Sequence, residues 1–398
     1  MYESVLRPDK PVRLHRRMAA RDVDERSRTA TPLELLFDLT FVVAVAQAAA
    51  RLAEDVAAGR VLHGAGAFLM VFFAIWWAWM NFTWFASAYD ADDVPYRIAT
   101  FVQMAGVLVL AAGAGRAFES GAYGPVTLGY AIMRLGLVSL WVRAAVQHPP
   151  GRATALRYAA GITVLQALWA GRLVVGAGYG LVGVGSFVVL AVLEMAVPAW
   201  AERTGGTTWH PHHIAERYGL FTIVLLGESV LAATNAVQEL VQESVRGELL
   251  AVSGAGLVIL ACLWWLYFSD SAGEALELRR QWSFAWGYGH FGIFVGIAAV
   301  GAGLEVNVMA TAHHDDAVHV PAAVVAGSVL LPIALVLVLL HVLRIPEAGS
   351  LTSLGALATT LVALVGLGWV ATVLGPAAAM LGAALSLVLL VAHATARA

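Results

Sequence analysis

The sequence predicts an all-α integral membrane protein with about twelve transmembrane helices, arranged as two parallel six-helix repeats. Composition indicates the membrane class: 60% of the 398 residues are hydrophobic and only 13% are charged. So little polar surface cannot cover a soluble globule of this length. Apolar runs of roughly 18 to 25 residues, long enough to cross about 30 Å of hydrocarbon, recur along nearly the whole chain.

These apolar runs divide the chain into predicted spans. We place them at 33–52, 61–86, 95–113, 122–146, 153–174, 179–200, 214–236, 248–268, 283–305, 321–342, 354–374 and 376–394. Gly171 and Arg172 interrupt the fifth span, and little more than Gly375 and Pro376 separates the last two. The first 30 residues are polar and have no apolar core, so we expect no cleavable signal peptide.

Basic residues predict the orientation of the spans, because cytoplasmic loops of membrane proteins carry an excess of Lys and Arg. With the N-terminus in the cytoplasm, the outside loops hold only Arg51, Arg60, Arg116, Arg172 and Arg246. Two further arginines, Arg134 and Arg217, lie within spans, and the remaining seventeen of the 24 basic residues lie inside. The expected topology is therefore N-in and C-in. The basic N-terminal tail is interleaved with acids and is interpreted as a topology anchor, so no nucleic-acid partner is expected.

An internal repeat relates the two halves of the chain. Glu34 and Thr40 align with Glu216 and Thr222 at an offset of 182 residues. At an offset of 188, residues 76–79 (WWAW) align with 264–267 (WWLY), and 111–115 (AAGAG) with 299–303 (AVGAG). Six spans per half is an even number, so both halves enter the membrane in the same sense, as in transporters with parallel repeats. The predicted organisation is a cytoplasmic polar tail over 1–30 and six-helix halves over 31–200 and 201–398.

Three segments carry a resemblance to a known family. They are TPLELLFDLTFV at 31–42, DADDVPYR at 90–97 and ERYGLFTIVLLGES at 216–229. These segments resemble the signature segments of the bacterial low temperature requirement A (LtrA) membrane family, over roughly residues 28 to 305. The resemblance implies a polytopic protein of the bacterial inner membrane. It implies no reaction, because the family is named for a growth phenotype in the cold.

Ionised groups within the spans mark the candidate site, because each costs roughly 2.5 to 3.5 kcal/mol to insert. Glu34 and Asp38 are four residues apart and share one helix face. Two such carboxylates would not both ionise readily, which suits a proton or cation site. In the alternative interpretation, Glu34 is a first-turn acid that stabilises the helix N-terminus after Thr31 and Pro32, and Asp38 bonds a neighbouring helix.

The seventh predicted span carries Glu216, Arg217 and Glu228. Arg217 and Glu228 are eleven residues apart, close to three turns, so they face the same way about 16 Å apart and cannot pair. We therefore expect Glu34 or Asp38 as the partner of Arg217. Glu228 lies deep in its span, where a carboxylate is most costly, and is the strongest single candidate for a functional residue. Glu216 is expected either in the pathway or at the interface.

Three further ionisable residues lie within spans or near their ends. Arg134 can hold a carboxylate as a structural pair, and Glu194, near a span end, is expected at the interface. His290 can relay protons, because histidine exchanges a proton near neutral pH, or can serve only as a hydrogen-bonded packing residue.

An enzyme is the alternative function. The cytoplasmic motif Asp90, Asp92 and Asp93 could hold Mg²⁺ against an isoprenoid or lipid diphosphate, and it is similar to the acid motif of class II terpene cyclases. An aromatic wall of Trp76, Trp77, Trp264 and Trp265 could stabilise a carbocation. Tryptophan at membrane interfaces and acidic loops are, however, also expected without any reaction.

The sequence contains no nucleotide-binding or hydrolase motif and no metal-ligand spacing. Histidines at 313, 314 and 319, and at 210, 212 and 213, lack a specific spacing, so no metal site and no cofactor are predicted. The predicted function is transporter-like or channel-like, with an intramembrane pathway of acids and arginines for a proton, cation or small solute. A membrane-embedded enzyme and a non-catalytic scaffold or sensor remain alternatives. The lipid bilayer and the solute are the expected partners.

Overall fold

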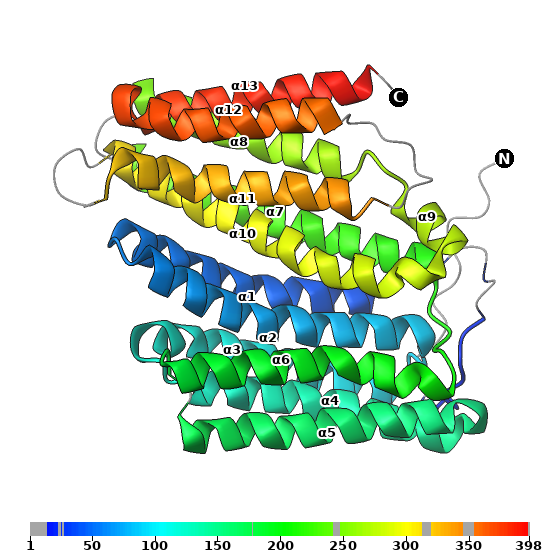
Figure 1. Cartoon of the computed structure of the whole chain (residues 1–398). Helices are drawn as coiled ribbons and strands as arrows, with labels where there is room; N and C mark the ends of the chain where they lie inside the picture. Colours follow the sequence, from blue (N-terminus) through cyan, green and yellow to red (C-terminus); the bar gives the residue numbers. More distant parts are fainter. Residues whose placement is uncertain are drawn as a thin grey trace.

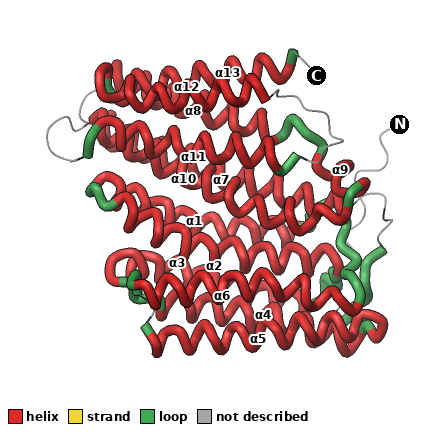
Figure 2. The backbone as a smooth tube through the Cα atoms, viewed as in Figure 1, coloured by secondary structure: helices red, strands yellow, loops and turns green. Residues whose placement is uncertain are grey.

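The fold is a bundle of long α-helices. The computed structural model describes residues 14–22, 25, 28–176, 178–241, 247–312, 320–344 and 354–396, and every regular element in these ranges is helical (Figure 1, Figure 2). The first half contains α1 (Pro32–Ala57), α2 (Val61–Ala88), α3 (Val94–Ser120), α4 (Gly124–Gln147), α5 (Arg152–Val175) and α6 (Leu181–Ala201). The second contains α7 (Pro211–Val241), α8 (Gly247–Tyr267), α9 (Ala272–Leu278), α10 (Ser283–Ala312), α11 (Ala322–Val342), α12 (Leu354–Leu374) and α13 (Pro376–Thr395).

Ten of these helices are long and apolar enough to cross a membrane, by length and composition among the described residues. The chain is therefore a multi-pass membrane protein. The predicted number of spans was twelve. Helices α5 and α7 cover the two remaining predicted spans but are not in the set of ten. Both are more polar, since α5 carries Arg157 and Gln166, and α7 carries Glu216, Arg217 and Glu228.

The element boundaries follow local sequence signals. Thr31 caps α1: its side chain accepts from the backbone of Glu34, the Glu34 side chain accepts from the Thr31 backbone, and Pro32 is the first helical residue. Asp93 caps α3 in the same way, by accepting from the backbone of Tyr96. Gly375 has a φ of +87°, which favours glycine, and breaks α12 from α13 as predicted. Helix α5 continues through Gly171, where a break was predicted.

The helices lie side by side in one stack (Figure 1). Helices α4, α5 and α6 form one edge of this stack, and α8, α12 and α13 form the other. Between these edges, α1 and α2 pack against α7 and α10. Helices α2 and α10 are the most buried of the ten candidate spans. This central seam is where the charged residues gather.

The N-terminal segment 14–22 lies against one end of the first half. Met18 is fully buried, and its backbone donates to the Gln147 side chain at 2.7 Å. The backbone of Arg16 donates to Asp93 at 2.7 Å, and that of Arg21 donates to the Ala88 carbonyl at 3.0 Å. The segment therefore covers the ends of α2, α3 and α4. The tail residues 1–13, 23, 24, 26 and 27 lie outside the described residues.

Candidate functional site

A buried charge cluster joins α1 and α7. Arg217 of α7 donates from Nη2 to Asp38 Oδ1 at 2.6 Å and from Nε to Asp38 Oδ2 at 3.1 Å. Its Nη1 forms an ion pair with Glu34 Oε1 at 2.9 Å. No more than 2% of any of the three residues is exposed. The pairing predicted for Arg217 is confirmed, and it involves both acids of α1.

Further polar groups complete the cluster. The His213 ring lies 3.1 Å from Glu34, and Arg28 lies 3.7 Å from the same carboxylate while it donates to the backbone carbonyls at the end of α2. Trp79 donates to Asp38 at 2.6 Å. Two arginines thus face two carboxylates, so the cluster balances its charge without a shared proton. Buried ions are tolerated when they are paired in this way.

The sequence predicted some residues of this cluster and missed others. Glu34 serves both as the first-turn acid of the alternative interpretation and as a partner of Arg217. His213, four residues before Arg217, shares its helix face and so could have been found by the same spacing argument. Arg28 and Trp79 carried no such signal, because their contacts depend on how the end of α2 meets the start of α1.

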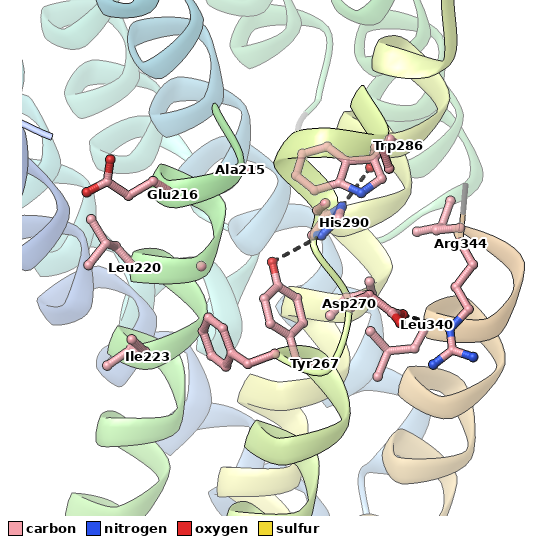
Figure 3. A pocket seen from close by; sticks show the side chains of 16 residues that line it. Ala215, Glu216, Leu220, Ile223, Tyr267, Asp270, Trp286, His290, Leu340 and Arg344 are labelled. Carbon is pink, nitrogen blue, oxygen red and sulfur yellow. Dashed lines mark hydrogen bonds and ion pairs between the residues drawn. The ribbon is translucent and has the colours of Figure 1, made fainter. Parts of the chain in front are cut away.

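A cavity of about 340 Å³ lies beside the cluster, between α7, α8, α9, α10 and α11. Figure 3 shows its lining, which is apolar over much of its surface. Glu216 of α7 lines it, whereas the adjacent Arg217 faces the charge cluster. One Glu216 oxygen accepts from the backbone of Ala30 at 3.1 Å. Consecutive residues of α7 therefore contact the cavity and the buried ion pairs.

His290 also lines this cavity. Its Nδ1 lies 2.7 Å from the Trp286 carbonyl and its Nε2 lies 3.2 Å from the Tyr267 hydroxyl (Figure 3). Asp270 and Arg344 pair at 2.8 Å in the same lining. His290 and Glu216 were predicted from the sequence as pathway residues, whereas the cavity and the places of Tyr267 and Arg344 in its lining were not. These residues come from four separate helices and loops, and no sequence spacing relates them.

Glu228 lies apart from both features. It is half-buried on α7, and no hydrogen bond or ion pair joins it to any described residue. It does not line the cavity around His290. The structure therefore brings Glu34, Asp38, Glu216 and Arg217 together and leaves Glu228 separate.

A second buried ion pair lies within the first half. Arg134 of α4 pairs with Glu194 of α6 at 3.3 Å and also contacts Tyr130. Trp77 and Trp169 donate to the same carboxylate at 2.6 and 3.1 Å. The structural pairing predicted for Arg134 is confirmed. The interfacial placement expected for Glu194 is wrong, because only 1% of the residue is exposed.

The four tryptophans of the proposed aromatic wall do not lie together. Trp76 and Trp77 of α2 are fully buried against Phe73, Tyr288 and Phe291. Trp264 and Trp265 of α8 are 46% and 49% exposed. The first pair belongs to the core of the bundle and the second to its surface, so they form no single wall.

The acidic motif between α2 and α3 is occupied by arginines. Asp90 pairs with Arg21 at 3.0 Å, Asp92 with Arg97 at 2.8 Å, and Asp93 with Arg143 at 2.5 Å. A Mg²⁺ ion needs several free oxygens that converge on one point. Within the described ranges, no group of three acidic, histidine or cysteine side chains could hold a metal ion. The aspartates therefore do not fit a diphosphate-bound Mg²⁺, and the enzyme alternative is not favoured.

The histidines before and within α7 also diverge. His210 contacts the Glu25 carbonyl at 2.8 Å, His212 pairs with Glu277 at 2.9 Å, and His213 faces Glu34. They share no ligand position. The other histidine set, at 313, 314 and 319, lies outside the described residues.

The buried carboxyl of Asp90, which pairs with Arg21 of the N-terminal segment, predicts that the stability of the protein depends on pH. Burial, reinforced by the charge of Glu34, raises the pKa of Asp90 to about 6, although Arg28 and Arg21 oppose the shift. The folded protein thus binds more protons than the unfolded chain between about pH 4 and pH 6. Since stability falls with pH wherever the folded state binds more protons, the free energy of unfolding should decline across this window by up to about 3 kcal/mol.

Melting temperatures of the purified protein at pH 4.5 and pH 7 measure this effect. Asp90→Asn should remove the part of the decline that Asp90 causes, whereas Asp92→Asn, whose side chain is about half exposed, should follow the wild type. An equal decline in the wild type and Asp90→Asn would contradict the assignment.

Comparisons with known proteins agree with this helical membrane architecture. The model of the family described as bacterial low temperature requirement A protein (LtrA) matches residues 29–395. The match extends past the expected limit near residue 305, so the C-terminal helices are part of the family domain.

The chain is also 26% identical over 311 residues to the uncharacterized protein RA0937 of Rhizobium meliloti (strain 1021), covering 74% of this chain and 73% of that protein. No solved structure gives a significant match. The chain belongs to the bacterial low temperature requirement A family.

Proposed function

We propose that this protein is a transporter-like or channel-like protein that carries a proton, cation or small solute. The observation that supports the proposal is the position of Glu216 and Arg217. Glu216 lines the 340 Å³ cavity, and Arg217 holds the buried carboxylates of Glu34 and Asp38. A rotation or tilt of α7 that follows a change in the cavity would therefore strain the only charge contacts that we find between α1 and α7 in the described chain.

Such a coupling is the requirement for alternating access, in which one element moves against another around a central site. Ion pairs between the moving elements can stabilise one conformational state. A solute that binds the other state more tightly then shifts the equilibrium toward it. The cluster lies between α1 and α7, and the cavity lies next to it, lined by Glu216 of the same helix α7. Glu228, three turns further along α7, would extend the pathway.

The parallel repeat is part of the same proposal. Helices α3 and α4 approach closely at Gly106 and Gly129, and α10 and α11 approach closely at Gly303 and Ser328. Along the chain, α3 to α6 pack in sequence, as do α10 to α13. These correspondences support two six-helix halves, with α9 as an addition to the second. In the proposed topology, the starts of α1 and α7 and the cavity lie at the cytoplasmic side of the bacterial inner membrane, with both termini inside.

Reconstitution into liposomes that contain a pH-sensitive or cation-sensitive dye tests the proposal. The wild type should show a flux, and Asp38→Asn, Glu216→Gln and Glu228→Gln should each reduce it at least tenfold. Glu119→Gln, an exposed carboxylate at the end of α3, is the matched control and should retain the wild-type flux. Unchanged flux in all three test variants would refute the pathway. A silent wild type with a stable partner in pull-down experiments would favour the scaffold alternative.

A further inference from the structure

We infer that the cavity between α7, α8, α9, α10 and α11 binds a small organic cation, an amine or ammonium group attached to an apolar or aromatic body. This deepens the proposed function, because it names the class of solute that the proposed pathway would carry. The binding itself does not depend on transport.

The charges in the lining favour a cation. Asp270 and Arg344 face each other at 2.8 Å and offset one another. Glu216 accepts a backbone N–H from Ala30 and forms no ion pair with another described residue. Of the charged groups that line the cavity, Glu216 is thus the one without an ion-pair partner in the lining. The cavity therefore carries a net negative charge, and a bound cation would offset it.

Hydrogen bonding leads to the same conclusion. A backbone carbonyl can only accept, so the contact with Trp286 assigns the proton of the neutral His290 ring to Nδ1. Nε2 is then an acceptor, and the Tyr267 hydroxyl must donate to it. The Tyr267 oxygen can itself accept, and it shares this capacity between the nearby Thr222 hydroxyl and a ligand. Asp270 Oδ1 is buried and accepts no hydrogen bond from a described residue. The lining thus offers several acceptors to a ligand that donates hydrogen bonds or carries positive charge.

The remaining lining suits the body of such a molecule. Trp286, Tyr267 and Phe268 line the cavity, and aromatic rings attract cations through their π faces. Leucine and isoleucine side chains from α7, α10, α11 and the residue after α11 complete it: Leu220, Ile223, Ile293, Leu340 and Leu343. A volume of about 340 Å³ is at the lower end of the range for small-molecule sites, roughly 300 to 1,000 Å³. The ligand is therefore a compact molecule rather than a lipid.

Calorimetric titration of the purified full-length protein with four probes tests the inference. Benzylamine and benzyltrimethylammonium are cations, benzyl alcohol is neutral and phenylacetate is an anion of similar size. We expect both cations to bind at least tenfold more tightly than the other two. Glu216→Gln should weaken both cations at least tenfold, and Tyr267→Phe should weaken benzylamine more than the quaternary ion, which donates no N–H.

Glu277→Gln, an exposed carboxylate on the neighbouring α9, is the matched control and should bind as the wild type. Leu220→Trp should fill the cavity and abolish all binding, while a melting curve of each variant reports its folding. Equal or tighter binding of phenylacetate, no effect of Glu216→Gln, or no binding of any probe would overturn the inference. Cation binding without flux would refute the transport proposal alone, and proton flux without cation binding would refute this inference alone.

Discussion

Arg217→Met is expected to destabilise the protein by about 3–5 kcal/mol, the usual cost of removing one partner of a buried ion pair. The variant leaves Glu34 and Asp38 buried, with Arg28, His213, Trp79 and the backbone N–H of Thr31 as the remaining groups that stabilise their charge. Methionine fills much of the space, so loss of volume contributes little. Thermal unfolding in detergent, followed by tryptophan fluorescence, measures the loss. In the cell, the same variant should accumulate to a much lower level.

Two further variants separate charge from packing. Neutralising the acids as well, in the combination Arg217→Met, Glu34→Gln and Asp38→Asn, should recover most of the lost stability, because no unpaired buried charge remains. Arg97→Met removes an arginine from an exposed pair with Asp92 and should cost less than about 1 kcal/mol. If Arg217→Met were as stable as the wild type, the cluster would contribute nothing to the contact between the halves.

Gly129 substitutions are expected to disrupt the packing of α3 against α4. A Cβ atom on Gly129 would lie 2.4 Å from the backbone nitrogen of Leu110 and 2.6 Å from the carbonyl oxygen of Gly106. Both are backbone atoms, so no side chain can rotate away, and the helices must separate. Gly129→Ala should therefore cost about 1–3 kcal/mol even after the gain of roughly 1 kcal/mol in helix propensity. Gly129→Leu should cost more and impair assembly.

The control for this substitution is on α5. Gly171 has no neighbouring heavy atom within 4 Å of an added Cβ, so Gly171→Leu should leave the melting temperature near or above that of the wild type. Size-exclusion profiles and melting curves of the four proteins provide the comparison. A Gly129→Leu protein as stable as Gly171→Leu would show that α3 and α4 can separate without cost.

Much of the helical architecture could be predicted because hydrocarbon thickness imposes a length on every apolar run. The break at Gly375 was correct, since Pro376 cannot continue the preceding helix and Gly375 accepts a positive φ. The break at Gly171 was wrong, because a single glycine within a helix lowers stability without ending the helix. Helix α9 was missed, since seven residues are too short for a periodic signal.

The charged site was predicted in part for an equally physical reason. A buried arginine requires a carboxylate, and the sequence offered Glu34 and Asp38 on one face of a corresponding helix. The same reasoning paired Arg134 with a carboxylate but did not identify Glu194, because residue 194 was taken to lie near the end of its span. Glu228 was the strongest candidate from the sequence. The depth of a carboxylate in a span predicts the free energy of placing it there, but it does not predict which residues the carboxylate contacts.

Composition and local spacing were enough to predict the membrane class, most helix limits and the buried charges of α1 and α7. The family was indicated separately, by the resemblance of three short segments. Tertiary structure alone decided that Arg217 binds both acids of α1, that arginines occupy the acidic motif around Asp93, and that Glu216 and His290 line one cavity. Those contacts join residues from different helices. They depend on how helices of similar length and polarity are rotated and offset against one another, and no periodicity within a single helix encodes that choice.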